Sequence, residues 1–449
     1  MRPFSMRDKL GYTLGDLGCC CTEQFRAMYL SVFYTLILQV NPFHIGILML
    51  ITKIWDAVND PIIGAIVDSR KATKGGKFIP WIRAFSFPMA VLCILGFVNV
   101  SNLAYGLRLA YMFVTYVLYE ALYTCVNVPF GTLSSVMTDD VRHRTALSRY
   151  RSLGGTIFMT VIVMVGPLVL YVDNKPVAGR FLMLASVFAL IGLLCLQITC
   201  VWCKERLAVP KRPKGEKLNY LHVIKEIAKN KALLGVMFFS LVGMIGASVV
   251  NGLNTYLFKD YFGNVKIMAV SGGLSVLYSL ITFAITQPLA DKLGKKEWCC
   301  WGAGFAAAVF ALLFFFPIHN PVLFIVINGV CYLGASGMQV LIWAMVNDSI
   351  DYHELQTGER NEGIVYSTYS FFRKLASAVS GSLSSFVLGF IGYNVAEGAV
   401  QTAEVSNAIW KSYTGIYVLG YGVAVAILFF VYPLTKAKTP EMLEQLKAR

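Results

Sequence analysis

Apolar stretches of about 20 residues recur along the whole chain, and this repetition limits the possible folds more than any other feature of the sequence. A helix of that length is what is needed to cross the hydrocarbon core of a bilayer. Only 14% of the 449 residues are charged, whereas roughly 25% is usual in a soluble protein. The sequence therefore predicts an all-α membrane protein. Twelve transmembrane helices are expected, near residues 11–39, 43–67, 81–101, 108–136, 150–172, 181–202, 232–258, 266–290, 298–317, 321–346, 364–391 and 412–433.

The basic residues are concentrated in alternate loops between these stretches. The formal net charge is +14, and Lys and Arg gather in segments 68–83, 139–151 and 204–231, whereas connections such as 41–44 are short and poor in charge. Basic short loops mark the cytoplasmic side of a membrane protein. Both termini are therefore predicted to be cytoplasmic, in a protein of the cell (cytoplasmic) membrane. Membrane topology explains the positive charge, so no nucleic-acid partner is expected.

The longest basic segment divides the chain into two halves. We expect a six-helix half at 1–203, a cytoplasmic linker at 204–231 and a second six-helix half at 232–449. After the second span of each half an Asp, Asp68 or Asp291, ends the helix and is followed by basic residues and Gly. Matching loops at matching places indicate a parallel repeat. A chance likeness in loop composition is the alternative.

The second span carries two acidic residues at bilayer depth, where a charge costs about 2.5 kcal/mol or more. Asp56 and Asp60 lie one helical turn apart, Asn59 is beside them, and Lys53 comes one turn earlier. Two buried carboxylates repel each other, so at least one is expected to bind a proton or a cation. Oxygen ligands suit a hard cation such as Na⁺. The alternative is that Lys53 and a basic residue from another span neutralise the pair permanently.

Two further spans carry charged residues in their apolar parts. Asp16, Cys20 and Glu23 share one face of the first span, and Arg26 follows Glu23 by three residues. Mutual neutralisation of Glu23 and Arg26 and contact of these side chains with a substrate both remain open. Glu120 stands alone in the fourth span.

The cytoplasmic end of the tenth span is acidic although this face of the protein is basic. Asp351 lies in this segment and Arg360 follows it. The segment is either a solvated surface or a latch that pairs with basic loops when the inner side closes. In the eleventh span, Lys374 is expected to face an internal counter-charge.

The chain has no convincing nucleophile–base set, phosphate-binding glycine loop or HExxH motif. Cys200 and Cys203 have CxxC spacing, but no second pair or His partner accompanies them. We therefore expect no enzymatic activity and no cofactor apart from the ion at the acidic pair, Na⁺ or H⁺.

Four motifs resemble those of the glycoside–pentoside–hexuronide cation symporters, the family of melibiose permease. They are GYTLGDLG at 11–18, IWDAVNDP at 54–61, GKFIPW at 76–81 and the segment 348–363. The resemblance covers nearly the whole chain and implies a major facilitator fold with twelve helices in two six-helix pseudo-repeat halves. It further implies a secondary active transporter that carries a sugar, glycoside or hexuronide with a cation by alternating access. The implied partners are the small-molecule sugar or glycoside, a monovalent cation and the lipid bilayer, and a monomer is expected.

The resemblance also assigns roles to residues. The implied cation ligands are Asp56, Asn59, Asp60 and Thr124, with Na⁺ possible at the two aspartates. Substrate contacts are expected at Asp16, Cys20, Glu23, Arg26, Asn127, Arg151, Gln339 and Lys374. Coupling or gating roles are expected for Lys53, Asp68, Asp291, Asp351 and Arg360.

Four positions depart from the family pattern. Cys20 and Asn127 replace the two sugar-binding aspartates of melibiose permease, and Gly131 and Gln339 each replace a tryptophan. A different glycoside is therefore predicted, and an anionic sugar such as a hexuronide would suit Arg26 and Arg151. The alternatives are a uniporter or lysolipid-type carrier with the same fold, and a membrane sensor that does not transport.

Overall fold

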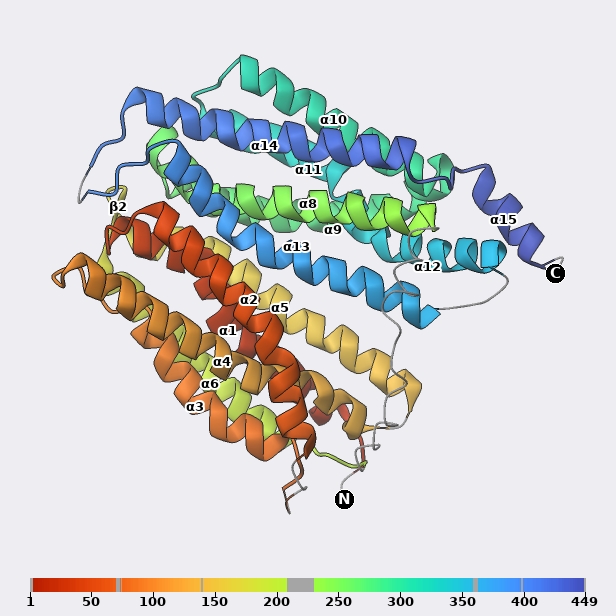
Figure 1. The fold of residues 1–449 in the computed structure, drawn as a ribbon, viewed down its shortest axis with the longest axis horizontal. Helices are drawn as coiled ribbons and strands as arrows, with labels where there is room; N and C mark the ends of the chain where they lie inside the picture. Colours follow the sequence, from red (N-terminus) through yellow and green to blue (C-terminus); the bar gives the residue numbers. More distant parts are fainter. Residues whose placement is uncertain are drawn as a thin grey trace. The chain divides into compact units, whose positions relative to one another are not determined.

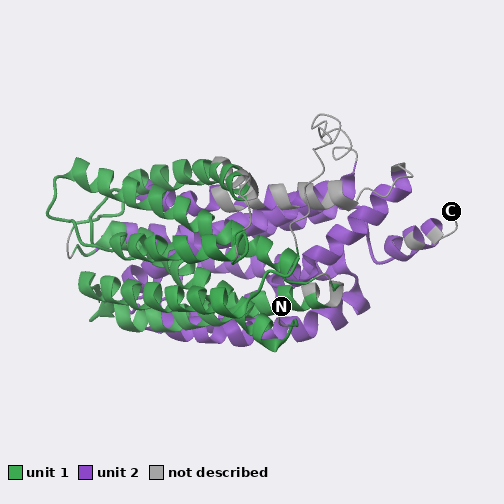
Figure 2. Cartoon of the chain, turned by 90° about the horizontal axis from the view of Figure 1, so that it is seen from below, with its two compact units in different colours: residues 1–211, 392–400 green, residues 212–391, 401–449 purple. Residues whose placement is uncertain are grey.

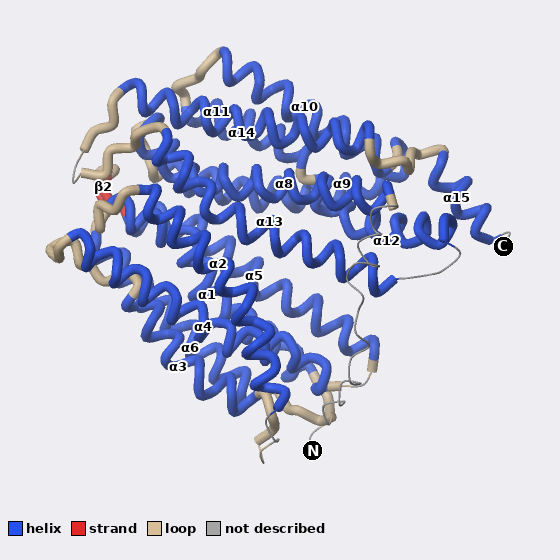
Figure 3. The backbone as a smooth tube through the Cα atoms, viewed as in Figure 1, coloured by secondary structure: helices blue, strands red, loops and turns tan. Residues whose placement is uncertain are grey.

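The computed structural model describes residues 3–69, 73, 75–138, 140–207, 230–357, 362–396 and 399–447, and almost all of this part is helical (Figure 3). Most of the predicted linker and Arg360 lie outside the described residues. Figure 2 shows two compact units, one of residues 1–211 with 392–400 and the other of residues 212–391 with 401–449.

The first unit contains six long helices and one short hairpin (Figure 1). Its helices are α1 (Met6–Leu36), α2 (Pro42–Ser69), α3 (Ile79–Leu95), α4 (Tyr105–Met137), α5 (Val141–Leu170) and α6 (Ala178–Trp202). Strands β1 (Tyr171–Val172) and β2 (Lys175–Pro176) pair antiparallel between α5 and α6.

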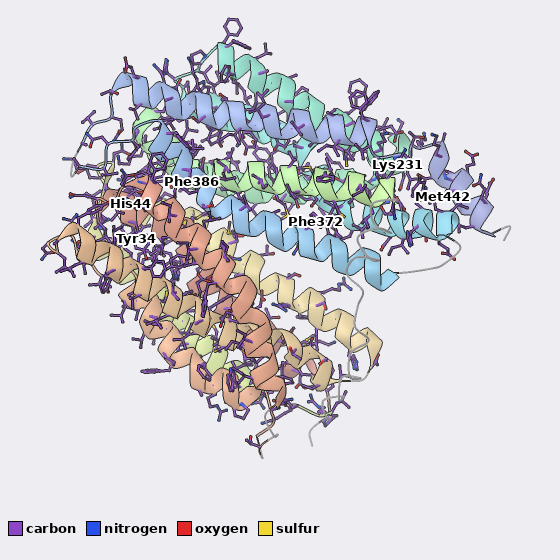
Figure 4. The ribbon with its side chains drawn as sticks, viewed as in Figure 1. Tyr34, His44, Lys231, Phe372, Phe386 and Met442 are labelled. Atoms are coloured by element: carbon purple, nitrogen blue, oxygen red, sulfur yellow. The ribbon has the colours of Figure 1, made fainter. Side chains whose placement is uncertain are left out.

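The second unit repeats this arrangement with one helix divided in two. Its elements are α8 (Lys231–Tyr256), a π-helical turn η1 (Leu257–Tyr261), α9 (Ile267–Leu293), α10 (Lys295–Phe315), α11 (Pro321–Ala335), α12 (Gly337–Thr357), α13 (Glu362–Phe390), α14 (Ala403–Phe430) and α15 (Lys438–Lys447). Met442 of α15, labelled in Figure 4, is 3% exposed and packs in a cluster with residues of α12.

The two units use the same helix pairings. In the first unit α1 packs against α5 and α6, α3 against α4 and α6, and α2 against α4. In the second unit α8 packs against α13 and α14, α10 against α11 and α14, and α9 against α11. When the helices are numbered from the start of each unit these are the same pairs, which is the pattern of a pseudo-repeat.

A helix, or two in the case of the tenth, lies at each of the twelve predicted spans. Within the described part, eight helical segments are long and apolar enough to cross a membrane by length and composition, while the apolar helix Ile79–Leu95 is shorter. The helical membrane-protein fold is therefore confirmed. The number of spans stays a prediction.

The predicted tenth span is interrupted where small residues bring two helices together. The break lies at Ser336, between α11 and α12. A Cβ atom added at Gly302 of α10 would overlap the backbone carbonyl of Gly334, and one added at Gly337 would overlap the indole of Trp298. Periodicity alone predicted one helix here, because Gly and Ser are tolerated in a helix and mark kinks only when packing uses them.

Equivalent tight turns precede the third helix of each unit. Gly76 has φ +104° and Gly294 has φ +106°, a conformation that favours glycine. In the first unit, the Glu205 carboxylate accepts hydrogen bonds from the backbone N–H groups of residues 77, 78 and 79, at 2.7, 2.8 and 2.8 Å. In the second unit the corresponding contact is made by a basic side chain. Lys296 Nζ donates a hydrogen bond to the carbonyl of Tyr432, just after the end of α14, at 2.6 Å. A carboxylate suits the start of a helix and an ammonium group suits the end of one.

Candidate functional site

Four charged residues of alternating sign form a chain across three helices of the first unit. Arg26 Nη2 of α1 lies 4.0 Å from Glu120 Oε1 of α4. Glu120 Oε2 lies 3.9 Å from Lys53 Nζ of α2, and Lys53 Nζ lies 3.1 Å from Asp56 Oδ2. The side chains of Arg26 and Glu120 are only 3% and 5% exposed. Glu120 is the lone acid of its span, and its carboxylate lies near both cations because α4 packs on both α2 and α1.

Arg26 is held mainly by aromatic rings. Its guanidinium carbon lies 3.5 Å from the ring centroid of Tyr119 and 5.0 Å from that of Tyr116. None of its three side-chain nitrogens makes a hydrogen bond within the described residues. Cation–π contact and one carboxylate at 4.0 Å therefore stabilise a charge that is almost completely buried.

Glu23 does not pair with Arg26, which was one of its two possible roles. Glu23 Oε2 is buried and has no hydrogen-bond partner in the part of the chain that the structure describes, and the same is true of Asn59 Nδ2. An amide presents either nitrogen or oxygen when it turns over, so Asn59 can also offer an oxygen at that place. Glu23 also interacts electrostatically with Lys53. Two polar groups without partners therefore lie beside the charged chain.

Acids outnumber bases among the described side chains around Lys53. Three acids, Glu23, Asp56 and Glu120, lie around two bases, Lys53 and Arg26. Glu23 Oε2 is the acidic oxygen that is buried without a hydrogen-bond partner among the described residues. A buried carboxylate in this situation takes up a proton or a cation.

A second polar cluster joins α1 to α5. Asp16 Oδ1 accepts a hydrogen bond from Arg151 Nε at 3.0 Å, and Asp16 Oδ2 accepts from the backbone N–H of Gly155 at 3.0 Å and from Cys20 Sγ at 3.8 Å. The helices approach closely here because a Cβ atom added at Gly154 would lie 2.8 Å from the backbone nitrogen of Leu17. The Arg151 side chain is 36% exposed, so this cation is open to a ligand.

The structure shows less of the surroundings of the other predicted site residues. Thr124 is buried on α4 and Asn127 is half-buried one turn later, while Gln339 is exposed on α12 of the second unit. Asp291 is exposed and accepts a hydrogen bond from Gln287 Nε2 at 2.9 Å. The side chains of three further predicted residues lie outside the described part: Asp60, Asp68 and Lys374.

The acidic end of α12 pairs with a basic turn of its own unit. Lys295 Nζ lies 2.7 Å from Asp348 Oδ2, and Asp351 is half-buried one turn further along α12. The pair joins the start of α10 to α12. The pair involves Asp348 and lies within one unit, so the latch expected around Asp351 stays a prediction.

Lys53 bears directly on the alternative raised for the two aspartates. Its Nζ lies 3.1 Å from Asp56 Oδ2, as permanent neutralisation would require, and the side chain of Asp60 lies outside the described part, so both interpretations stay predictions. The sequence signal that could have identified Glu120 and Tyr119 was the isolated acid in an apolar span. Their helical period does not reveal which neighbouring helix they face.

The chain is similar to known proteins over nearly its whole length. The profile of a family described as MFS/sugar transport protein matches residues 11–436. An uncharacterized symporter, YjmB of Bacillus subtilis (strain 168), is 31% identical over 98% of this chain and 95% of its own length. The isoprimeverose transporter of Lactiplantibacillus pentosus is 29% identical over 100% of this chain and 93% of its own. Among solved structures, a D-xylose-proton symporter matches with a TM-score of 0.61 at 14% identity, covering 96% of this chain and 98% of that chain.

Proposed function

Because the chain belongs to the MFS/sugar transport protein family, and is thus a multi-pass membrane transporter and not an enzyme, we propose that it is a symporter for a sugar or glycoside. Uptake is coupled to Na⁺ or H⁺ and proceeds by alternating access of the two units. The protein works as a monomer in the cell membrane with both termini in the cytoplasm.

The buried carboxylate of Glu23 beside Lys53 is the observation that carries cation coupling. One of its oxygens has no hydrogen-bond donor among the described residues, and the carboxylates of Asp56 and Glu120 also lie near Lys53. Asp60 lies one turn beyond Asp56 on α2 and adds a further acid to the same helix. A proton or a sodium ion at this place neutralises a buried carboxylate.

Lys53 competes with the coupling ion for the carboxylate of Asp56. The ammonium group lies 3.1 Å from Asp56 Oδ2, and an arriving cation takes its place. Substrate then binds more tightly, and by reciprocity substrate raises the affinity for the cation. When the cation leaves, Lys53 returns to Asp56 and the empty carrier can reorient without an ion.

The substrate contacts are proposed around Asp16 and Arg151. Asp16, Cys20 and Arg151 form a hydrogen-bonded polar group on α1 and α5. One relative of the chain is the isoprimeverose transporter of Lactiplantibacillus pentosus, which supports a sugar as the substrate. A carboxylate on the sugar would bind Arg151, whose side chain is 36% exposed, rather than Arg26, whose side chain is 3% exposed. A hexuronide is therefore included among the candidate substrates.

Transport by purified protein in lipid vesicles tests this function. Vesicles receive an imposed sodium or proton gradient, and uptake is measured for a panel of neutral glycosides and hexuronides. Accumulation above equilibrium with one of the two gradients is expected. Flux that ignores both gradients would indicate the uniporter or lysolipid-type carrier, and no flux with any member of the panel would favour a sensor.

Asp56→Asn separates coupling from binding. The variant is expected to lose gradient-driven accumulation while retaining exchange of labelled for unlabelled sugar, since exchange needs no return of the empty carrier. Asp173→Asn is the matched control, because Asp173 is exposed in the β1–β2 turn at φ +47°, a conformation that Asn accepts. Normal accumulation by the Asp56 variant would remove this residue from the coupling site.

A further inference from the structure

A cavity of about 460 Å³ lies between α3 and α6 of the first unit, away from the charged chain. Its lining residues are Gly75, Ile79, Pro80, Arg83, Ala84, Cys200 and Lys204. It lies where α3 begins and α6 ends, at the side that the basic loops predict to be cytoplasmic. The volume falls in the range of roughly 300–1,000 Å³ that is typical of ligand sites.

Two basic residues, Arg83 and Lys204, line this cavity. Neither Arg83 nor Lys204 belongs to an ion pair within the described residues, and both are exposed. Arg83 Nη2 makes one contact with the carbonyl of Cys200 at 3.5 Å, which is at the long limit for a hydrogen bond. The nearby acid, Glu205, is occupied by three backbone N–H groups at the start of α3. The cavity therefore carries a net positive charge.

One residue that lines the cavity has a backbone carbonyl without its usual helical donor. Pro88 lies inside α3 and has no N–H, so the carbonyl of Ala84, four residues earlier, lacks its helical donor. Ala84 lines the cavity. A ligand that brings both an anion and a hydroxyl donor would match the two cations and this carbonyl.

Apolar side chains extend from the cavity along both helices. On α3, Phe87, Val91 and Leu95 follow Arg83 at intervals of four residues and are 62%, 39% and 39% exposed. On α6, Leu194 and Val201 are 54% and 53% exposed. Residues four apart lie on one helix face, so the exposed apolar surface of α3 runs in line with Arg83.

We propose that this cavity binds the headgroup of an anionic phospholipid, with phosphatidylglycerol as the best match. The phosphate lies between Arg83 and Lys204, the glycerol hydroxyls donate to the carbonyl of Ala84, and the acyl chains lie along Phe87, Val91 and Leu95. Basic pockets between transmembrane helices bind anionic lipid headgroups on the cytoplasmic side in the same way. The site lies outside the residues proposed for transport and does not depend on that function.

Lipid titration of the full-length protein in detergent, followed by native mass spectrometry, tests the assignment. Phosphatidylglycerol is expected to bind more tightly than zwitterionic phosphatidylcholine. Removing each cation should weaken the binding of phosphatidylglycerol about five-fold, and the double variant Arg83→Gln with Lys204→Gln should weaken it about 25-fold. The control removes the same two residue types at exposed positions elsewhere, Arg149→Gln with Lys231→Gln, and should leave the affinity unchanged.

Three results of the titration would overturn the assignment. The first is equal affinity for the two lipids, and the second is equal weakening of binding by the cavity variant and the control. The third is binding of soluble glycerol phosphate at the same concentration as the lipid, because the acyl chains would then contribute nothing. If the double variant does not fold, phosphatidylglycerol carrying a photoreactive acyl chain is applied to the wild-type protein. Crosslinks concentrated on 83–95 and 190–202 support the site, and crosslinks spread evenly over the helices refute it.

Discussion

The pairing of Arg26 with Glu120 yields a quantitative prediction about stability. Two unit charges 4.0 Å apart interact by about 4 kcal/mol at an effective dielectric constant of 20. Both side chains are almost completely buried, so screening by water does not reduce this value much. Arg26 has no other carboxylate within 4.0 Å among the described residues, whereas Glu120 also lies 3.9 Å from Lys53.

Glu120→Gln should therefore be more destabilising than Arg26→Met. The first change leaves a buried guanidinium without its acid and should lower the free energy of unfolding by about 3–5 kcal/mol. The second leaves Glu120 paired with Lys53 and should cost less. Because the double variant has neither buried charge, it should recover part of the loss, with a coupling energy of about 2–4 kcal/mol.

Unfolding in mixed micelles of dodecyl maltoside and sodium dodecyl sulfate can measure this cycle. A thiol-reactive dye reports unfolding, since nine of the eleven cysteines are buried and all are free. The same cycle on Asp16→Asn and Arg151→Met is the control, because Arg151 is 36% exposed and the coupling should be about 1 kcal/mol or less. A coupling energy below about 0.5 kcal/mol for Arg26 and Glu120 would refute the pairing, because independent sites are additive within that value.

Three further predictions concern the start of α3, the contact of α10 with α11, and the proposed substrate site. Glu205→Gln should lower the free energy of unfolding by about 1–2 kcal/mol, because a neutral amide interacts less strongly with the amides at the start of α3, and no change in the micelle assay would contradict this role. Gly302→Ala should cost about 1–3 kcal/mol because its Cβ atom overlaps a carbonyl of α11, whereas the control Gly422→Ala, with open space at its Cβ position, should be neutral or stabilising. Bound sugar should slow alkylation of Cys20 but not of the other half-buried cysteine, Cys300, in peptide mass spectrometry, and equal rates with and without sugar would place the substrate elsewhere.

Much of the architecture follows from local sequence patterns. An apolar stretch of about 20 residues has one low-energy state in lipid, a helix, because every backbone group must be hydrogen-bonded within the segment. The helices consequently lie at the predicted places. The contact of Lys53 with Asp56 could also be predicted from the sequence, since residues three apart share one helix face. The turns at Gly76 and Gly294 were indicated by glycine and basic residues between two spans.

Contacts between helices could not be obtained in this way. Glu120 lies between Arg26 and Lys53 only because α4 packs on both α1 and α2, and Arg151 reaches Asp16 only because Gly154 allows α5 to approach α1. The interruption at Ser336 likewise depends on the contact of α11 with α10.

The sequence by itself thus determined that the chain forms membrane helices, where they lie along the chain, and that acids and bases are buried in them. The tertiary structure decided which acid meets which base. It also left a buried oxygen of Glu23 without a hydrogen-bond partner among the described residues. The physical reason is that backbone hydrogen bonding and helical period act within one segment. The rotation and axial position of one helix against another are decided by side-chain packing between segments far apart in the chain.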